Sequence, residues 1–226
     1  NLNYKTENSW CYDDKDENGA KYGRLYTWAS AVGKTETECG SGQECNLGTG
    51  DIRGVCPEDW HLPSKEEWED LFKAVGGQST AGTKLKSKTG WMEYSGINNE
   101  DAFGFSALPA GRRYSVGNYY YEGYYAEFWS STKVDGIYAY QMYLGYEDEY
   151  AYLYDTYKFY GFSVRCVKDN PDSKSAKSSG IINLAIPCKI EEEDNCEYGE
   201  LVDDRDGQTY KTVKIGDQEW MAESLN

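Results

Sequence analysis

One run of acidic residues and one histidine are the positions in this chain whose side chains could catalyse a reaction. Glu147, Asp148 and Glu149 could supply the paired carboxylates that glycoside hydrolysis requires. Three consecutive acids in a loop rich in glycine and tyrosine are, however, typical of a solvated turn. His61 is the only histidine and precedes a predicted helix, where a hydrogen-bonded packing role is commoner than catalysis. We therefore predict that the chain is not an enzyme.

Metal binding has little support in the sequence. A single histidine excludes a Cys₂His₂ zinc site and any site with two histidines within the chain. A calcium ion takes about six to eight oxygen ligands. The candidates for such ligands are Asp135, Glu147, Asp148 and Asp155. We predict no metal and no cofactor, and we keep calcium as the alternative.

Tyrosine is the residue type that most suggests a binding function. The chain has 22 Tyr and 7 Trp but only 6 Phe. A tyrosine has an apolar ring and a polar tip, so it is stable when half-exposed, and rings separated by small polar residues resemble an antibody binding surface. Alternatively, many of these tyrosines could be cross-strand pairs or line solvated strands. The predicted ligand-binding residues are Tyr119, Tyr120, Tyr121, Tyr124, Tyr125, Tyr146, Tyr150, Tyr152, Tyr154 and Tyr157.

Composition and charge exclude several classes of partner. The chain has 226 residues, which suggests one or two domains, and its formal net charge is −16. This charge would repel a nucleic-acid backbone and an anionic membrane surface. No apolar run approaches the roughly 20 residues of a membrane-spanning helix. No signal peptide is visible, in a chain that does not begin with Met.

The seven cysteines indicate an oxidising compartment. None forms a CxxC pair, which argues against a zinc ribbon or a thioredoxin-like site. The short spacings of Cys39 to Cys45 and of Cys188 to Cys196 suit local disulfides, which leaves Cys56 and Cys166 as a long-range pair and Cys11 without a partner. Spacing alone leaves other connectivities open. Such disulfides would place the chain at the cell surface, in the periplasm or outside the cell.

The pattern of apolar residues predicts helices early in the chain. Residues 23–33 carry an apolar stripe with helical spacing, which ends at Gly33. Ser64 and Glu67 form a capping box, an apolar stripe follows, and Gly76-Gly77 ends this second helix. The intervening segment 34–55 is expected to be a loop.

Short strands are predicted after residue 100, which gives an α+β layout. Phe162, Val164 and Cys166 would share the buried face of the last strand, and alternation places Tyr138, Tyr140, Met142 and Leu144 together on a buried side. Residues 169–180 are predicted to be a linker. The acidic stretch 191–206 is predicted to be poorly packed. Residues 209–221 are predicted to form a hairpin with a II′-type turn at Gly216-Asp217. The predicted strands are 102–113, 127–132, 137–144, 149–155 and 161–168.

Six segments carry a resemblance to a known family: AKYGRLYTWASAV (20–32), GVCPEDWHLPSKEEWEDLFKAVGG (54–77), AGTKLKSKTGW (81–91), DAFGFSALPAGRR (101–113), FWSST (128–132) and GFSVRCVKD (161–169). In this order and spacing, residues 1–168 resemble the Fibrobacter succinogenes major paralogous domain family of extracytoplasmic bacterial domains. The resemblance implies a C-type-lectin-like fold of the formylglycine-generating-enzyme type. Two early helices and a late twisted antiparallel sheet are then expected.

The resemblance also implies how the chain is divided. The family's opening segment, DxRDGxTYKTVxIGxQxWMAENLNY, is similar to residues 204–226, at the far end of this chain. We therefore expect residues 1–168 to be a lectin-like domain without its first hairpin, 169–203 an acidic and serine-rich linker, and 204–226 the first hairpin of a following repeat. Such a hairpin could dock back on 1–168 and cover the exposed edge of its last strand.

Departures from the family pattern limit the chemistry that the resemblance implies. The family often has a second cysteine where this chain has Gly19, so the partner of Cys11 is missing. A formylglycine-generating enzyme needs a reactive cysteine pair, but Cys166 matches the structural disulfide and no second pair is present. The lectin calcium motifs Glu-Pro-Asn and Trp-Asn-Asp are also absent.

These observations favour a non-catalytic binding or adhesion module that is secreted or displayed on the cell surface. Its expected partners are a glycan or a surface protein and the neighbouring repeat of the same chain. The alternative is a structural repeat of a bacterial surface lipoprotein with no ligand of its own. An enzyme of the formylglycine-generating type is a distant third.

Overall fold

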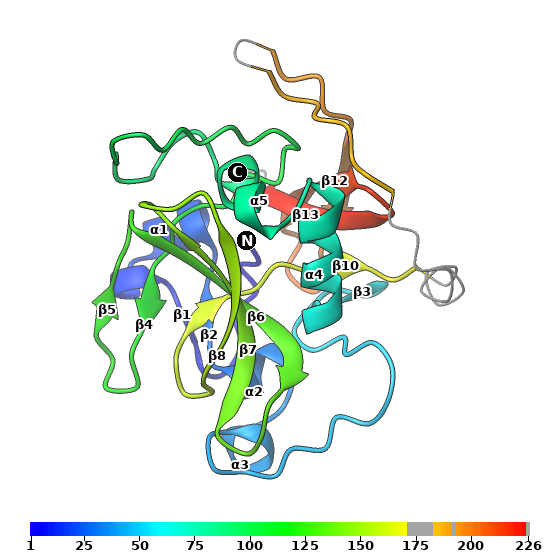
Figure 1. Cartoon of the computed structure of the whole chain (residues 1–226). Coiled ribbons are helices and arrows are strands. Elements are labelled where there is room, and N and C mark those ends of the chain that lie inside the picture. The colour runs from blue at the N-terminus through cyan, green and yellow to red at the C-terminus, as the bar shows by residue number, and fades with distance from the viewer. Residues whose placement is uncertain (171–182, 191–192, 225–226) are drawn as a thin grey trace.

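Helices precede the long strands in this chain, so the fold is α+β, as predicted (Figure 1). The structure is a computed structural model that describes residues 1–170, 183–190 and 193–224. It has five short helices in that part of the chain where two were expected. They are α1 (Asp16–Tyr22), α2 (Trp28–Ala31), α3 (Glu36–Cys39), α4 (Lys65–Ala74) and α5 (Gln78–Leu85), and a 3₁₀ turn, η1 (Tyr12–Asp14), precedes them.

The larger sheet has six strands in the order β1-β2-β9-β6-β7-β8. Its neighbours are antiparallel except for β6 and β9, which are parallel. The long strands β6, β7 and β8 form a meander at one end, and β8 is the edge strand. The bounds are β1 (Ser9–Trp10), β2 (Leu25–Tyr26), β6 (Tyr125–Lys133), β7 (Tyr138–Gly145), β8 (Ala151–Tyr157) and β9 (Phe162–Ser163).

The second sheet is antiparallel, in the order β11-β12-β13-β10-β3. It joins segments that lie far apart in the sequence. A separate two-stranded ribbon pairs β4 with β5. The bounds are β3 (Trp60–His61), β4 (Arg112–Arg113), β5 (Tyr119–Tyr120), β10 (Val167–Lys168), β11 (Tyr198–Val202), β12 (Thr209–Ile215) and β13 (Gln218–Ser224).

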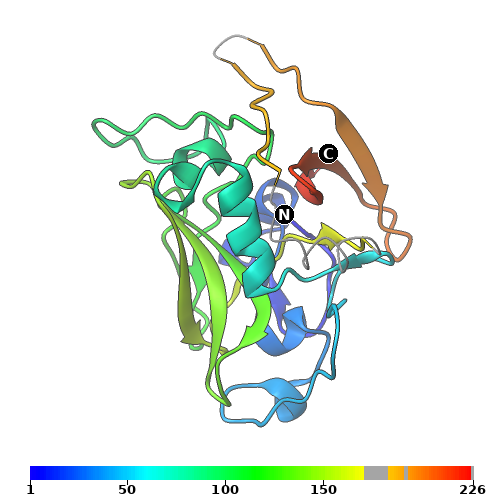
Figure 2. The ribbon, with the colours of Figure 1, turned by 45° about the vertical axis from the view of Figure 1, so that its right-hand side comes forward.

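Helix α4 lies between the six-stranded sheet and the β12–β13 hairpin (Figure 2). Its fully buried Trp68 contacts both sides, with its ring centroid 6.0 Å from that of Phe128 on β6 and 4.7 Å from that of Trp220 on β13. A second core packs around Trp28 and the disulfide of Cys56 and Cys166. Both cores draw side chains from the early helices and from the C-terminal hairpin.

The capping box correctly located helix α4. The Ser64 hydroxyl accepts a hydrogen bond from the Glu67 amide at 3.2 Å, and the Glu67 carboxylate accepts one from the Ser64 amide at 2.9 Å. This reciprocal pair satisfies two amides that have no partner inside the helix. The helix ends before Gly76 and Gly77, whose φ angles of 102° and 107° lie in the region that favours glycine.

The single helix predicted over 23–33 is wrong. Leu25 and Tyr26 form strand β2, which pairs with β1 on one side and with β9 on the other, and the helix is confined to Trp28–Ala31. Thr27 separates the two elements because its side chain accepts a hydrogen bond from the Ser30 amide. Helical spacing of apolar residues therefore concealed a strand whose partners lie elsewhere in the chain. The predicted loop 34–55 also contains α3.

The strand predictions hold where the partner strands are adjacent in sequence. The segments 127–132, 137–144 and 149–155 lie within or overlap β6, β7 and β8. Met142 and Leu144 are buried as expected, whereas Tyr138 and Tyr140 are only half-buried. Tyr138 and Tyr140 lie on the same side of β7 as Met142 and Leu144 but closer to the strand's N-terminal end.

Two predicted strands differ from the structure. Residues 161–168 divide between β9 and β10, which belong to different sheets, and Arg165 is as deeply buried as its neighbours, so no half-exposed face exists. In 102–113 the side chains of Phe103 and Phe105 are buried, but the backbone is not a strand before β4. Positive φ angles at Gly104 and Ser106 interrupt the extended conformation.

The C-terminal part is more ordered than its charge suggested. Within the acidic stretch 191–206, residues 198–202 form β11, and Asp203 is fully buried in a 2.6 Å ion pair with Arg205. The predicted hairpin is present as β12 and β13, and Gly216 has a φ of 61° at its turn. Residues 171–182, which include most of the predicted linker, lie outside the described residues.

Three disulfides join Cys39 to Cys45, Cys56 to Cys166 and Cys188 to Cys196, as the spacing suggested. The longest spans 110 positions and ties the segment before β3 to the segment before β10. Cys11 is a buried free thiol, and burial raises its pKa. Three disulfides in one short chain are typical of an oxidising compartment.

We predict that Gly19→Cys will form a fourth disulfide with Cys11. A Cβ atom placed on Gly19, which lies inside helix α1, would be 2.5 Å from the Cys11 sulfur, too close for an unbonded contact. A cysteine at this position can therefore reach the Cys11 sulfur after a small shift, whereas other side chains would collide with it. The bond should raise the free energy of unfolding by roughly 2 kcal/mol because it closes a short loop in the unfolded chain. Thiol titration and urea unfolding measure both effects. Gly19→Ser should show no gain, and a free thiol count of two in folded Gly19→Cys would contradict the prediction.

Candidate functional site

Seven tyrosines form a continuous surface on the six-stranded sheet. Tyr125 on β6 and Tyr143 on β7 point away from Phe128 and Met142, which lie on the opposite side of the same strands and pack in the core beneath α4. Tyrosines of β5, β8 and the turns beside them extend this surface. We call the set the tyrosine face: Tyr120, Tyr121, Tyr125, Tyr143, Tyr150, Tyr152 and Tyr154.

The rings of the tyrosine face contact one another in series. The ring centroid of Tyr125 lies 4.8 Å from that of Tyr121 and 5.2 Å from that of Tyr143. Tyr143 in turn lies 5.8 Å from Tyr154, which stacks on Tyr152 at 5.1 Å and 12°. Four of the seven remain exposed: Tyr120 (45%), Tyr121 (40%), Tyr150 (45%) and Tyr154 (46%). The rings of the tyrosine face therefore contact one another and still leave part of their surface accessible to solvent.

The other four predicted residues lie outside this surface. Tyr124 and Tyr146 pack against each other at 5.0 Å, and Tyr146 also contacts Tyr94. Tyr119 packs on Tyr12 and donates its hydroxyl to Asp14 at 2.6 Å. Tyr157 pairs with Tyr138 across β7 and β8 at 4.7 Å. The structure thus unites six of the ten in the face, and none of the ten is buried. Tyr119, Tyr124 and Tyr146 lie in separate clusters, whereas ring contacts through Tyr160 and Tyr114 connect Tyr157 to Tyr120 of the face.

A buried ion pair supports the tyrosine face from below. The fully buried Glu127 on β6 accepts hydrogen bonds from Arg112 Nε at 2.7 Å and Nη2 at 2.6 Å. The guanidinium carbon lies 5.2 Å from the ring centroid of Tyr121 and 5.9 Å from that of Tyr125. Burial raises the pKa of Glu127, and Arg112 opposes that shift. A bidentate pair enclosed by rings fixes the orientation of those rings.

Beside this pair lies an unused hydrogen-bond acceptor. Gln141 is 5% exposed, shares its side of β7 with Tyr143, and contacts Glu127. Among the described residues, its side-chain oxygen has no hydrogen-bond donor. A buried acceptor without a protein donor is unfavourable, and a water is the donor small enough to reach it.

Sequence reasoning missed Arg112, Glu127 and Tyr143 as site residues. A signal for Glu127 was present, because alternation along β6 places it on the side of Tyr125, and a charged residue between the apolar Ala126 and Phe128 of a strand is unusual. Tyr143 belongs to the same tyrosine-rich strands as the predicted residues. No local pattern linked Arg112 to Glu127, since their contact depends on the tertiary fold.

Two buried lysines fix the turns at the ends of β7. Lys86 Nζ donates to the carbonyl oxygens of Gly145 and Asp148 at 2.8 and 2.7 Å and lies above the ring of Trp91. At the other end, Lys158 Nζ donates to the Asp135 carbonyl at 2.7 Å. Burial lowers the pKa of Lys86 to about 8 and also lowers that of Lys158. The strands that carry the tyrosine face are therefore held at both ends.

The acidic residues considered for catalysis or calcium binding accept hydrogen bonds within these turns. Asp148 accepts hydrogen bonds from the Tyr150 amide at 2.9 Å and from the Tyr152 hydroxyl. Asp135 accepts the amides of Ile137 and Tyr138 at the opposite end of β7. The four acids proposed for calcium are thus not brought together. Asp148 sits in the expected turn, and the absence of catalysis remains a prediction.

His61 lies between two carboxylates. Its Nδ1 is 2.6 Å from Asp169, and its Nε2 is 3.1 Å from both oxygens of Glu67. Burial by itself lowers the pKa of His61, but Glu67 and Asp169 raise it above the usual value. The ligand atoms of His61, Glu67 and Asp51 lie within 4.8 Å of one another. Since both ring nitrogens already have partners and Glu67 caps α4, this cluster fits the packing role expected for His61.

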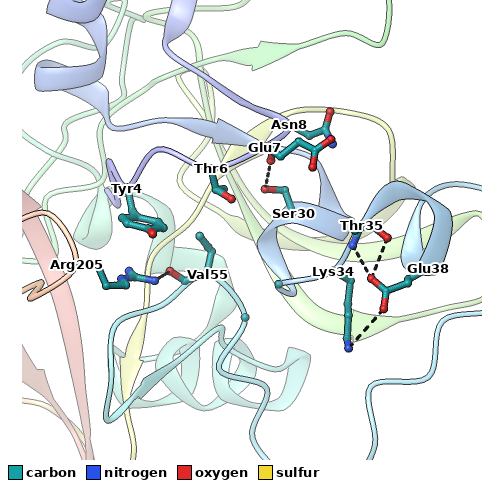
Figure 3. A pocket seen from close by; sticks show the side chains of 12 residues that line it. Tyr4, Thr6, Glu7, Asn8, Ser30, Lys34, Thr35, Glu38, Val55 and Arg205 are labelled. Atoms are coloured by element: carbon teal, nitrogen blue, oxygen red, sulfur yellow. Dashed lines mark hydrogen bonds and ion pairs between the residues drawn. The ribbon is translucent and has the colours of Figure 1, made fainter.

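Two cavities of the described structure lie away from the tyrosine face. The first, about 300 Å³, has Tyr4 and Arg205 on one side and Lys34 and Glu38 on the other (Figure 3). The two cations that line it already have partners, because Arg205 binds Asp203 and Lys34 faces Glu38. The second, about 530 Å³, is lined by residues 44–52 and the end of β6. The tyrosine face is an open surface instead.

Comparison with known proteins identifies a family. Among the described residues, no helix has the length and apolar character needed to cross a membrane. No curated protein and no solved structure matches the chain. The model of the Fibrobacter succinogenes major domain matches residues 1–168, which is most of the chain. Because this match covers most of its length, the chain belongs to the Fibrobacter succinogenes major domain family.

Proposed function

We propose that this chain is a non-catalytic binding or adhesion module that acts outside the bacterial cytoplasm and holds its partner on the tyrosine face. The observation that carries the proposal is the continuous series of accessible rings on a fixed support. We further propose that its α+β fold is of the C-type-lectin-like type that the family resemblance implies. The disulfides and the charge of the chain favour display at the cell surface or secretion.

The chemistry of the tyrosine face suits an extended, uncharged partner. Tyrosine rings contribute large contact areas at low entropic cost, and their hydroxyls exchange hydrogen bonds with either a glycan or a protein surface. The net charge of −16 disfavours polyanionic ligands. An open face without a cavity fits a chain or a flat surface better than a small molecule.

The decisive experiment removes the exposed rings while keeping the fold. Wild-type protein and a Tyr121→Ala/Tyr150→Ala/Tyr154→Ala variant are tested on a glycan array, on insoluble polysaccharides and on whole bacterial cells, with and without calcium. We expect at least about a ten-fold loss of binding in the variant, because aromatic residues at the centre of an interface dominate its affinity. The melting temperature should change little, since these rings lie outside both cores.

An exposed tyrosine outside the face provides the control. Tyr94→Ala removes a ring that is 51% exposed and packs on Tyr146, outside the face, so it should leave binding unchanged. Loss on polysaccharides identifies a glycan, whereas loss on protease-sensitive cell components identifies a protein. Should the face variant lose stability while the wild type binds nothing, the chain is better described as a structural repeat of a surface lipoprotein.

A further inference from the structure

The C-terminal hairpin lies outside the matched family domain, yet it completes that domain's interior. The match ends at residue 168, whereas β12 and β13 span 209–224. Trp220 and Met221 on β13 are fully buried, one in each core. The hairpin residues buried against 1–168 in these cores are Tyr210, Val213, Ile215, Trp220, Met221 and Ala222, and Leu201 of the adjoining β11 is buried with them.

Polar contacts set the position of the hairpin on the domain. The Met221 amide donates to the Cys166 carbonyl at 3.0 Å, next to the single paired position of Val167 and Trp220. Lys168 and Glu219 form an ion pair at 3.0 Å. At the other end, Arg205 lies over the ring of Tyr4 and donates to the Val55 carbonyl at 2.9 Å (Figure 3). These contacts define one specific docking site.

The hairpin is nevertheless a separable unit. Strands β11, β12 and β13 form their own antiparallel unit, and only β13 pairs with the domain. No described disulfide joins it to residues 1–168, because Cys188–Cys196 closes within the preceding segment. That segment docks together with the hairpin. The amides of Ala185 and Cys188 each donate to a carbonyl of residues 1–168, those of Ala74 and Ala102, at 2.8 Å, and Lys189 pairs with Asp101 at 2.6 Å. Residues 169–182 connect β10 to this unit, and a chain of this length spans at most roughly 46–50 Å when fully extended.

We propose that the docking site on residues 1–168 accepts residues 183–224 from a second copy of this chain. An exchanged hairpin makes the same contacts as the chain's own hairpin, so only the entropy of association opposes exchange. The high effective concentration of the attached hairpin favours the closed monomer at low protein concentration. Exchange is then expected during folding at high local concentration, as on a crowded surface. Head-to-tail exchange would join several tyrosine faces in one assembly.

Disulfide trapping tests the exchange directly. Lys168→Cys and Glu219→Cys are placed in separate chains, both in a Cys11→Ser background so that no other free thiol remains. The two chains are unfolded together in acidic denaturant without reductant, which keeps the native disulfides, then refolded and oxidised. We expect a covalent heterodimer whose yield rises with protein concentration. Its yield should exceed several-fold that of a control pair, Lys168→Cys with Asp204→Cys, in which the second cysteine lies at the exposed far end of the hairpin.

A single chain that carries both Lys168→Cys and Glu219→Cys shows whether the two positions can form a disulfide. We expect this chain to form it as a monomer when refolded at low concentration. If it does so while the separate chains give no more heterodimer than the control pair at any concentration, the exchange proposal is wrong. This outcome would leave the proposed binding function untouched, since that function depends on different residues.

Discussion

Trp220→Ala is expected to lower the free energy of unfolding by about 3–5 kcal/mol, a large part of the stability of a domain of this size. The Trp220 side chain is fully buried, and its ring lies 4.7 Å from Trp68 and 5.8 Å from Phe105. Its removal would leave a cavity between α4 and the second sheet, which neighbouring side chains cannot fill without moving. Chemical unfolding followed by circular dichroism measures the loss, because this signal does not depend on the deleted indole.

Val202→Ala is the matched control for this substitution. Val202 lies in β11 of the same C-terminal unit but is 47% exposed, so its truncation should change stability by less than about 0.5 kcal/mol. Equal effects of the two substitutions would mean that the hairpin does not belong to the core of residues 1–168. That result would also remove the basis for the exchange of hairpins between copies.

Loss of the Cys56–Cys166 disulfide is the second large effect that we expect. The double variant Cys56→Ala/Cys166→Ala should lose about 4–5 kcal/mol, because this bond closes a loop of 110 positions and so restricts the unfolded chain strongly. Both sulfurs are fully buried next to the hairpin that docks on Cys166. Thermal and urea unfolding of the purified variant measure the change.

The short disulfide provides the comparison. Cys39→Ala/Cys45→Ala opens a loop of only six positions and should cost about 2 kcal/mol on the same entropic basis. Both of these cysteines are also buried, so the loss of packing is similar in the two variants. If the two double variants lose the same stability, loop length is not what makes the long disulfide important.

Local signals in the sequence predicted the elements whose contacts are local. The capping box at Ser64 located α4, and alternation located β6, β7 and β8, which pair with their neighbours along the chain. The strand β2 could not be found in this way, because its partners β1 and β9 lie in distant segments. Residues 161–168 have the alternation of one strand but divide between two sheets, because the partners of β9 and β10 also lie in distant segments.

The sequence predicted which type of residue forms the candidate site but not which tyrosines belong to it. The number of tyrosines indicated a contact surface, and the structure keeps all ten predicted rings at least partly accessible. Their division into separate clusters depends on which strands adjoin, which no spacing revealed. The pair of Arg112 and Glu127 is the clearest omission, since a buried charge becomes interpretable only when its partner is known.

The rings of the tyrosine face lie on the side of the meander that faces away from the core beneath α4, which has a consequence for how the molecule can change over evolutionary time. Tyr120, Tyr150 and Tyr154 are exposed and lie outside both cores, so their side chains can be exchanged without disturbing the residues that make the protein fold. The proposed binding surface can then diversify among members of the family while the architecture stays constant.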